Sequence, residues 1–218
     1  MALRALLLLL CLSACYRHQW PLTPGVVSYS TYKIYMDDRQ GTAWVVDKHH
    51  LVTAGHVCRG GGDAVIQGDI RSFRASPVLW SYGNGVHDLC VLETRVALER
   101  PLVVADVMPR VGDPVFFVGY PSGEYVESSG TFLGDLDGDW TYNNAVSSAP
   151  CGPGASGSAL YTSQGVWGVL VRQRTDGGYI HDPSEGCAVV DLQELRRFLR
   201  EAGINYLTPP LDPTNDLP

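Results

Sequence analysis

The chain has 218 residues, of which 45% are hydrophobic and 18% charged, and its formal net charge is −7. The composition supplies a substantial core and excludes whole-chain disorder, and the length allows one ordinary domain or two small lobes. The acidic balance argues against a dedicated nucleic-acid binder, which carries a basic face. The 24 glycines and 14 prolines are typical of turn-rich β structure.

Residues 1–14 have the features of an export signal of the lipoprotein type. Arg4 supplies a positive charge, and the apolar run Ala5–Leu12 is too short to span a bilayer. The run closes with Leu-Ser-Ala-Cys15, and small residues before a cysteine resemble the bacterial lipoprotein box, in which cleavage precedes a diacylated cysteine. We therefore expect a lipid anchor at Cys15. An ordinary secretory signal and an uncleaved anchor are the alternatives.

This interpretation places the protein in the cell envelope, either in the periplasm or at the cell surface. It would be attached to the membrane through its lipid anchor, or otherwise secreted. Residues 15–25 are rich in aromatic residues and proline, and we expect them to form a tether. No later segment approaches the ~20 uninterrupted apolar residues of a membrane span.

Short β-type runs separated by turn sequences follow along the chain. In the first half they are Val26–Ile34, Thr42–Val46, Leu51–Ala54, Ala64–Ile66, Val78–Tyr82 and Leu89–Leu92. In the second half they are Val115–Gly119, Ser128–Leu133, Gly157–Tyr161, Val166–Val171 and Cys187–Val190. Their spacing suggests about six strands per half, which predicts an all-β pair of barrels or sandwiches rather than βαβ units.

A helix is predicted over residues 191–202. Asp191 can cap it, Glu194 completes a capping box, and Gly203 ends it. One face is apolar, formed by Leu192, Leu195, Phe198 and Leu199. We place the N-terminal β unit at 26–107, the C-terminal β unit with this helix at 108–207, and a flexible tail at 208–218.

Four cysteines lie beyond the signal: Cys58, Cys90, Cys151 and Cys187. An even number in an exported protein favours two disulfides, and four cysteines allow three pairings. Metal binding is the competing interpretation. However, the sequence has no C-x-x-C motif, and the adjacent His49 and His50 lack ligand spacing. We expect neither a metal nor a cofactor.

Two segments carry candidate functional residues in the first half. His56 follows the apolar run Leu51–Ala54, where a lone histidine is more often a structural core residue than a catalyst. Asp88 stands just ahead of Leu89–Leu92, so its carboxylate would be carried inward, where it needs a partner such as an imidazole N–H. Capping of a turn is the alternative role for this aspartate.

The third segment is Gly154-Ala-Ser156-Gly-Ser158. Glycines around a serine let the backbone turn tightly and expose the hydroxyl. They can also aim successive backbone N–H groups at one spot, as an oxyanion hole requires. Taken alone, the segment would fit an inactive Gly/Ser turn equally well.

Together, the order His56, Asp88, Ser156 resembles the chymotrypsin/trypsin-like serine proteases. Thr-Ala-Gly-His56 is similar to the family's Thr-Ala-Ala-His, and Asp88-Leu-Cys-Val-Leu to its Asp-Ile-Ala-Leu-Leu. The Gly-Ala-Ser156-Gly-Ser segment is similar to Gly-Asp-Ser-Gly-Gly. Segments 111–123 and 165–171 are closest in style to the bacterial HtrA-like branch. The resemblance covers residues 26–203.

The resemblance implies two six-stranded antiparallel β-barrels with the active site between them and a short C-terminal helix. It makes Ser156 the nucleophile, His56 the general base and then acid, and Asp88 the group that orients the imidazole. The backbone N–H groups of Gly154 and Ser156 would form the oxyanion hole. The implied function is a serine endopeptidase that cleaves a protein or peptide substrate through an acyl-enzyme. A catalytically inactive trypsin-fold binding lipoprotein and a structural surface lipoprotein are the alternatives.

The sequence departs from the family's patterns in three places. Ala155 stands where trypsin-like zymogens have an aspartate that captures a freed N-terminus, so we expect no activation by N-terminal insertion. The chain ends soon after the predicted helix, so we expect no HtrA-type peptide-binding domain. Ser158 replaces the second glycine after the nucleophile and is small enough to be tolerated.

By the same resemblance, Pro150 occupies the position of the aspartate that selects basic side chains in trypsin, so a preference for Lys or Arg is not expected. The other pocket residues would be Cys151, Val171, Arg172 and Gln173. The contact between His56 and Asp88 would also bring two thiols together. We therefore expect the disulfides Cys58–Cys90 and Cys151–Cys187.

Overall fold

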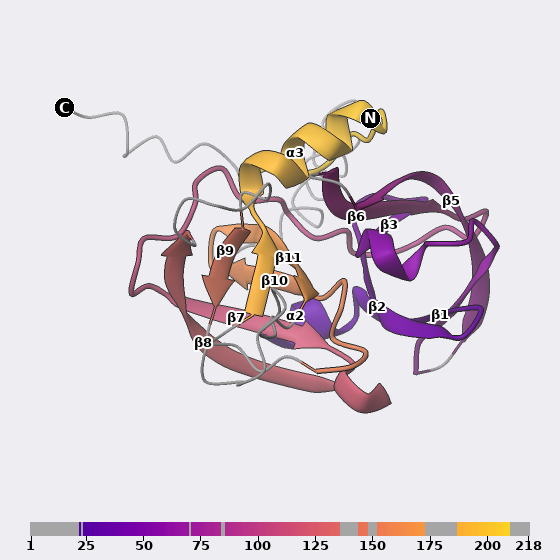
Figure 1. Cartoon of the computed structure of the whole chain (residues 1–218), viewed down its shortest axis with the longest axis horizontal. Coiled ribbons are helices and arrows are strands. Elements are labelled where there is room, and N and C mark those ends of the chain that lie inside the picture. The colour runs from indigo at the N-terminus through magenta and orange to yellow at the C-terminus, as the bar shows by residue number, and fades with distance from the viewer. Residues whose placement is uncertain are drawn as a thin grey trace, which may run out of the picture.

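Antiparallel strands close into two separate barrels in the computed structural model of the chain (Figure 1). The structure describes residues 22, 24–69, 71–83, 86–135, 144–147, 152–172 and 187–209. The fold is therefore all-β with few helices, as the turn-rich composition predicts. The expected signal, residues 1–14, lies outside the described residues, as do most of the expected tether and tail.

The first barrel pairs its strands in the order β1-β2-β3-β6-β5-β4, and β4 returns to β1 to close it. Its strands are β1 (Thr31–Met36), β2 (Arg39–Val45), β3 (His50–Thr53), β4 (Ala64–Gln67), β5 (Ser72–Gly83) and β6 (Val86–Glu93). In β4, Ala64 and Ile66 point inward while Val65 and Gln67 face solvent, which is the period of two expected for a half-buried strand.

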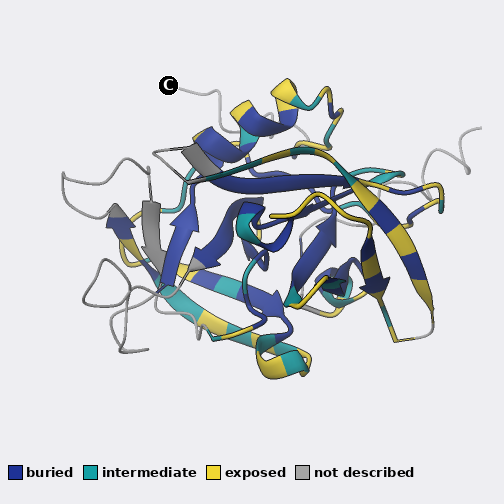
Figure 2. Cartoon of the chain, turned by 45° about the vertical axis from the view of Figure 1, so that its right-hand side comes forward, coloured by how far each residue is buried: buried dark blue, intermediate teal, exposed yellow. Residues whose placement is uncertain are grey.

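The second barrel pairs in the order β10-β11-β12-β9-β8-β7, and β7 pairs with β10 to close it. Its strands are β7 (Pro114–Gly119), β8 (Val126–Asp135), β9 (Asn144–Ser147), β10 (Ala159–Thr162), β11 (Gly165–Arg172) and β12 (Cys187–Val190). The dark-blue strand interiors in Figure 2 show that each barrel has a buried core. Burying one large apolar side chain, such as Ile34 in the first core or Phe117 in the second, contributes about 1.5–3 kcal/mol.

The first predicted strand is wrong at its start. The segment that begins at Val26 is not extended, because Pro24–Ser28 forms a short helix, α2, and β1 begins only at Thr31. Side chains hold this turn: Ser28 Oγ donates to Gly25 O at 3.0 Å, and Thr31 Oγ1 donates to Val27 O at 2.9 Å. These local hydrogen bonds outweigh the strand preference of the two adjacent valines.

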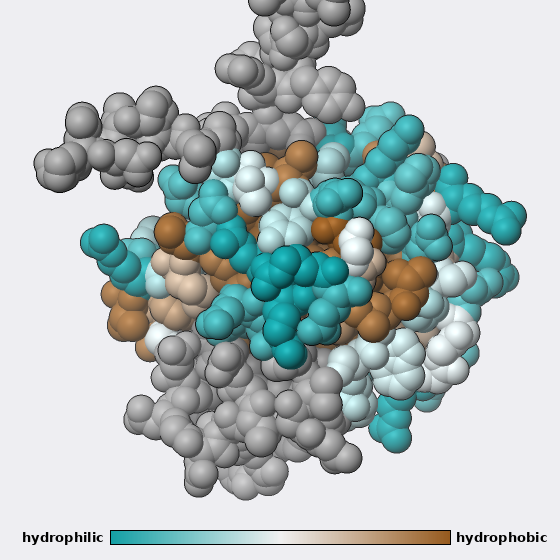
Figure 3. Space-filling model, turned by 90° about the horizontal axis from the view of Figure 1, so that it is seen from above, coloured by the Kyte–Doolittle hydropathy of each residue, from teal (hydrophilic) through white to brown (hydrophobic). Residues whose placement is uncertain are grey.

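The predicted C-terminal helix is confirmed as α3 (Leu192–Glu201). Asp191 caps it by accepting a hydrogen bond from Glu194 N at 2.9 Å. The helix packs its apolar face on β11 and β6, so it contacts both barrels (Figure 1). Seen from the α3 side in Figure 3, the surface is largely hydrophilic at the centre, with hydrophobic patches among the polar side chains.

The segment that connects the two barrels, around residues 101–105, is hydrogen-bonded to the main chain of both. Leu102 N donates to Val45 O in the first barrel at 2.8 Å. Val166 in the second barrel donates to Val103 O at 2.8 Å and accepts from Ala105 N at 2.9 Å. All of these residues are buried. None of the helices in the described part of the chain is long and apolar enough to cross a membrane.

Candidate active site

His56 and Asp88 meet at one end of the first barrel. After β3, the single turn η1 (Gly55–Val57) presents His56, and β6 carries Asp88. His56 N donates to Asp88 Oδ1 at 2.6 Å, and His56 Nδ1 lies 2.7 Å from Asp88 Oδ2. The Asp88 side chain is only 7% exposed, so the carboxylate takes up these two donors in place of water. With its proton on Nδ1, the imidazole keeps Nε2 as a hydrogen-bond acceptor.

A disulfide ties the two segments that carry this pair. Cys58, directly after η1, is bonded to Cys90 in β6, and both residues are fully buried. The structure thus contains the first expected disulfide, two residues beyond His56 and two beyond Asp88. Cys187 is also disulfide-bonded, whereas Cys151, its expected partner, lies outside the described residues.

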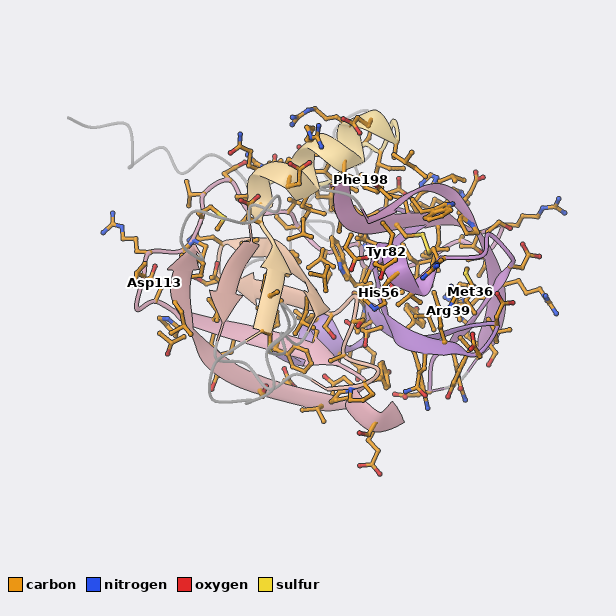
Figure 4. All side chains as sticks on the ribbon, viewed as in Figure 1. Met36, Arg39, His56, Tyr82, Asp113 and Phe198 are labelled. Carbon is orange, nitrogen blue, oxygen red and sulfur yellow. A yellow bond between two sulfur atoms is a disulfide. The ribbon has the colours of Figure 1, made fainter. Side chains whose placement is uncertain are left out.

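Two further side chains, Tyr82 and Arg39, contact His56, and a third, Arg59, packs on Tyr82; all three were missed from the sequence. The Tyr82 ring lies 6.1 Å from the imidazole between centroids, and the Arg59 guanidinium lies 5.7 Å from the Tyr82 ring centroid. Arg39 Nη1 donates to His56 O at 3.5 Å. Figure 4 shows Tyr82 and Arg39 close to His56. No spacing in the sequence indicates these contacts, because each side chain comes from a different turn or strand end.

A close approach of backbones brings the Ser156 loop against the first barrel. Thr42 N donates to Ser156 O at 2.8 Å. A Cβ placed on Gly41 would lie 2.9 Å from both Ser156 O and Val57 Cγ2, so glycine is needed where the loop, β2 and η1 meet. Gly157 has φ of +89°, and a Cβ there would lie 2.1 Å from Thr42 O. The glycine pattern of the sequence is therefore a requirement of this contact.

The main-chain N–H groups of the loop divide into two sets. One set donates within the protein: Ala155 N to Gly152 O at 3.0 Å, Gly157 N to Leu170 O at 2.6 Å, and Ser158 N to Ala155 O at 3.0 Å. By contrast, the N–H groups of Gly154 and Ser156 make no hydrogen bond to any described residue. These are the two groups that the family resemblance assigns to an oxyanion hole. As far as the described residues go, both donors are available for a ligand.

The main-chain carbonyls of the loop explain why these two N–H groups point away from the described acceptors. Pro153 O accepts from Ser122 N at 2.6 Å, and Ala155 O accepts from Ser158 N at 3.0 Å. A trans peptide points its N–H opposite to its C=O, so holding these oxygens turns the N–H groups of Gly154 and Ser156 the other way.

The hydroxyl of Ser156 lies beside β11. Its Oγ donates to Val171 O at 3.5 Å, and among the described residues it makes no hydrogen bond to His56. Such contacts are often loose in a free enzyme and tighten when substrate binds. Of the expected pocket residues, Val171 is buried near Ser156, and Arg172 ends β11. Pro150, Cys151 and Gln173 lie outside the described residues.

Within the described ranges, no group of three or more His, Cys, Asp or Glu side chains could hold a metal ion.

Comparison with known families finds a match to the trypsin-like peptidase domain over residues 41–168. The chain belongs to the trypsin-like peptidases. It is accordingly a serine-type peptidase by family, with the double-barrel fold that its strands form. No curated protein matches the sequence.

Solved structures share the fold of this trypsin-like peptidase. An inactive form of Rv3671c from Mycobacterium tuberculosis H37Rv superposes with a TM-score of 0.68 at 22% identity, covering 84% of this chain and 92% of that one. The HtrA-type protease AlgW, solved with a tripeptide, has a TM-score of 0.68 at 20% identity, covering 83% of this chain. A serine endoprotease from Yersinia pestis has a TM-score of 0.66 at 16% identity, covering 82% of this chain. The match spans 63% of the AlgW chain and 64% of the Yersinia chain.

Proposed function

We propose that this trypsin-like peptidase is a serine endopeptidase that works through Ser156, His56 and Asp88. The observation that carries the proposal is that the N–H groups of Gly154 and Ser156 donate to no described residue, on a loop held against the barrel that pairs His56 with Asp88. A serine hydroxyl is a weak nucleophile until a neighbouring base takes its proton, and the acyl transfer needs donors for the oxygen that becomes negative.

The proposed reaction begins when Ser156 Oγ attacks the carbonyl carbon of the scissile peptide bond. Its proton passes to His56 Nε2, and the carbonyl oxygen, now negative, accepts hydrogen bonds from the Gly154 and Ser156 N–H groups. Collapse of the tetrahedral intermediate breaks the C–N bond, and the leaving amine takes the proton from His56. Water, deprotonated by His56, then hydrolyses the acyl-enzyme. Asp88 holds the ring and stabilises the imidazolium in both stages.

Labelling of the purified full-length chain with a fluorophosphonate probe, followed by peptide mapping, tests this assignment. Ser156 should be the modified residue, Ser156→Ala should not label because the attacking oxygen is gone, and His56→Ala should lower the labelling rate by about 10⁴-fold or more. Ser129→Ala, which removes an exposed hydroxyl on β8, serves as the matched control and should label normally. A folded wild-type protein that does not label would favour the alternative, a catalytically inactive binding lipoprotein.

We further propose that the enzyme is exported and lipid-anchored at Cys15, because the Leu-Ser-Ala-Cys sequence follows a short apolar run. Two acyl chains are enough for stable membrane attachment. Expression in a bacterial host with radiolabelled palmitate should label the wild-type chain and leave Cys15→Ala unlabelled and out of the membrane fraction. Membrane attachment of Cys15→Ala without label would instead indicate an uncleaved anchor.

A further inference from the structure

Thr42 in β2 is a fully buried polar residue at the junction of the two barrels. Its hydroxyl donates to Gly154 O at 2.9 Å and accepts from Tyr120 N at 2.9 Å. Its main-chain N–H donates to Ser156 O at 2.8 Å, and its main-chain oxygen accepts from Thr53 Oγ1 at 2.7 Å. One residue of the first barrel therefore contacts the carbonyls of both residues assigned to the oxyanion hole.

The contact with Tyr120 links Thr42 to the peptide group that precedes Gly154. Tyr120 leads into the single turn η2 (Pro121–Gly123), where Ser122 has a left-handed backbone with φ of +53°. Ser122 N is the donor that holds Pro153 O at 2.6 Å. The two peptide groups that flank Gly154 are thus fixed by one network, directly through the Thr42 hydroxyl and indirectly through Tyr120 and the η2 turn.

We propose that Thr42 is a positioning residue for the oxyanion hole, which it sets from the neighbouring barrel. The inference rests on the proposed function of Ser156 and adds a residue that does not touch the substrate. A hydroxyl is required here because one side chain must donate to Gly154 O and accept from Tyr120 N at once. An isosteric valine would leave both buried groups unpaired, and rotation of the peptides next to Gly154 would relieve that cost.

The test compares Thr42→Val with Thr42→Ser and with a matched control, Thr94→Val. Thr94 is also buried, donates to Arg74 O at 2.9 Å and accepts from Val96 N at 3.2 Å, but it follows β6 and lies outside the Thr42 network. The readout is the fluorophosphonate labelling rate, separated into the limiting rate and the half-saturating probe concentration, together with thermal unfolding.

Thr42→Val should lower the limiting labelling rate by about 10- to 100-fold. Loss of one oxyanion-hole donor costs about 10²–10³-fold, and here the donors remain but are misaligned. The half-saturating concentration and the pH midpoint of labelling should stay unchanged, because the His56–Asp88 pair is untouched. Thr42→Ser should restore the rate, and Thr94→Val should label as wild type. Equal losses in Thr42→Val and Thr94→Val, or no rescue by serine, would overturn the proposal.

A second measurement decides the role of Thr42 even if the protein proves inactive. The amide ¹H and ¹⁵N chemical shifts of Gly154 and Ser156 should change in Thr42→Val and not in Thr94→Val. Unchanged shifts would refute the positioning role, whereas absence of labelling in the wild type would refute only the proposed function. If the valine variant does not fold, Thr42→Ala removes the hydroxyl without adding a methyl group, and the same outcomes apply.

Discussion

The two barrels hold their parts of the site in different ways. In the first barrel, His56 and Asp88 are joined by direct hydrogen bonds and by the Cys58–Cys90 disulfide, all within one unit. In the second barrel, the Ser156 loop takes part of its support from outside, through Thr42 of the first barrel. In the proposed active site, the His56–Asp88 pair is therefore held within one barrel, whereas the Ser156 loop depends on the barrel interface. Substitutions should therefore affect the His56–Asp88 pair and the Ser156 loop independently.

The largest expected effect comes from removing the negative charge of Asp88 in the first barrel. Asp88→Asn keeps the shape of the side chain but removes the carboxylate that fixes the His56 tautomer, so the labelling rate should fall by about 10⁴-fold. The control is Asp47→Asn. Asp47 also accepts from a histidine, His50 Nδ1 at 2.8 Å, but outside the site. A loss in Asp88→Asn no larger than that in Asp47→Asn would show that the His56–Asp88 contact is only structural.

An intermediate effect is expected from removing the Cys58–Cys90 disulfide of the same barrel. The disulfide closes a loop with a sequence separation of 32 residues. In the double variant Cys58→Ala/Cys90→Ala, the free energy of unfolding should drop by roughly 3–4 kcal/mol, because the unfolded chain gains freedom. Urea unfolding measures this change. The folded fraction should label faster than Asp88→Asn, since both His56–Asp88 hydrogen bonds remain. An unchanged unfolding midpoint would show that the disulfide does not stabilise the protein.

The smallest expected effect is a pH dependence in the second barrel. Burial, with a contribution from the charge of Asp69, raises the pKa of Tyr120 to about 12. Burial and the adjacent Glu127 also raise the pKa of Tyr161. These pKa values lie above that of an unfolded tyrosine, about 10, so stability is full below about pH 10 and is lost as pH rises toward the folded pKa values.

Tyr161→Phe should therefore lose less stability than wild type when urea unfolding is compared at about pH 8 and about pH 11. Tyr29→Phe, which changes an exposed tyrosine, should follow the wild-type curve. A Tyr161→Phe curve parallel to wild type would place the alkaline sensitivity elsewhere. Neither tyrosine substitution should alter the His56–Asp88 pair, so a change in alkaline stability can be assigned to the second barrel.

What the sequence predicts well is local in the chain. The α3 cap follows from residues three positions apart, and the inward position of Asp88 follows from the apolar run after it. Family resemblance supplied the pairing of Cys58 with Cys90 and the closed barrels. The strand β9 (Asn144–Ser147) was not predicted, because its two apolar residues are too few to form a recognisable pattern.

The contacts of Thr42 could not be predicted for a different reason. Its hydroxyl joins Gly154, 112 positions away, and Tyr120, 78 positions away. In the sequence it is an ordinary threonine in an apolar run, and only barrel closure and the meeting of the two barrels give it these partners. The same is true of Tyr82 against His56. The residues proposed to carry out the chemistry lie in recognisable local motifs, whereas the residues proposed to position them are identified only by their contacts in the folded structure.

The connection around residues 101–105 limits how this chain can be rearranged in evolution. It is paired with the main chain of both barrels and buried between them, so it is no interchangeable spacer. A recombination joint there would leave main-chain donors without acceptors on both sides. Although each half is a closed barrel, we expect the two to be inherited, fused or transplanted intact only as a pair.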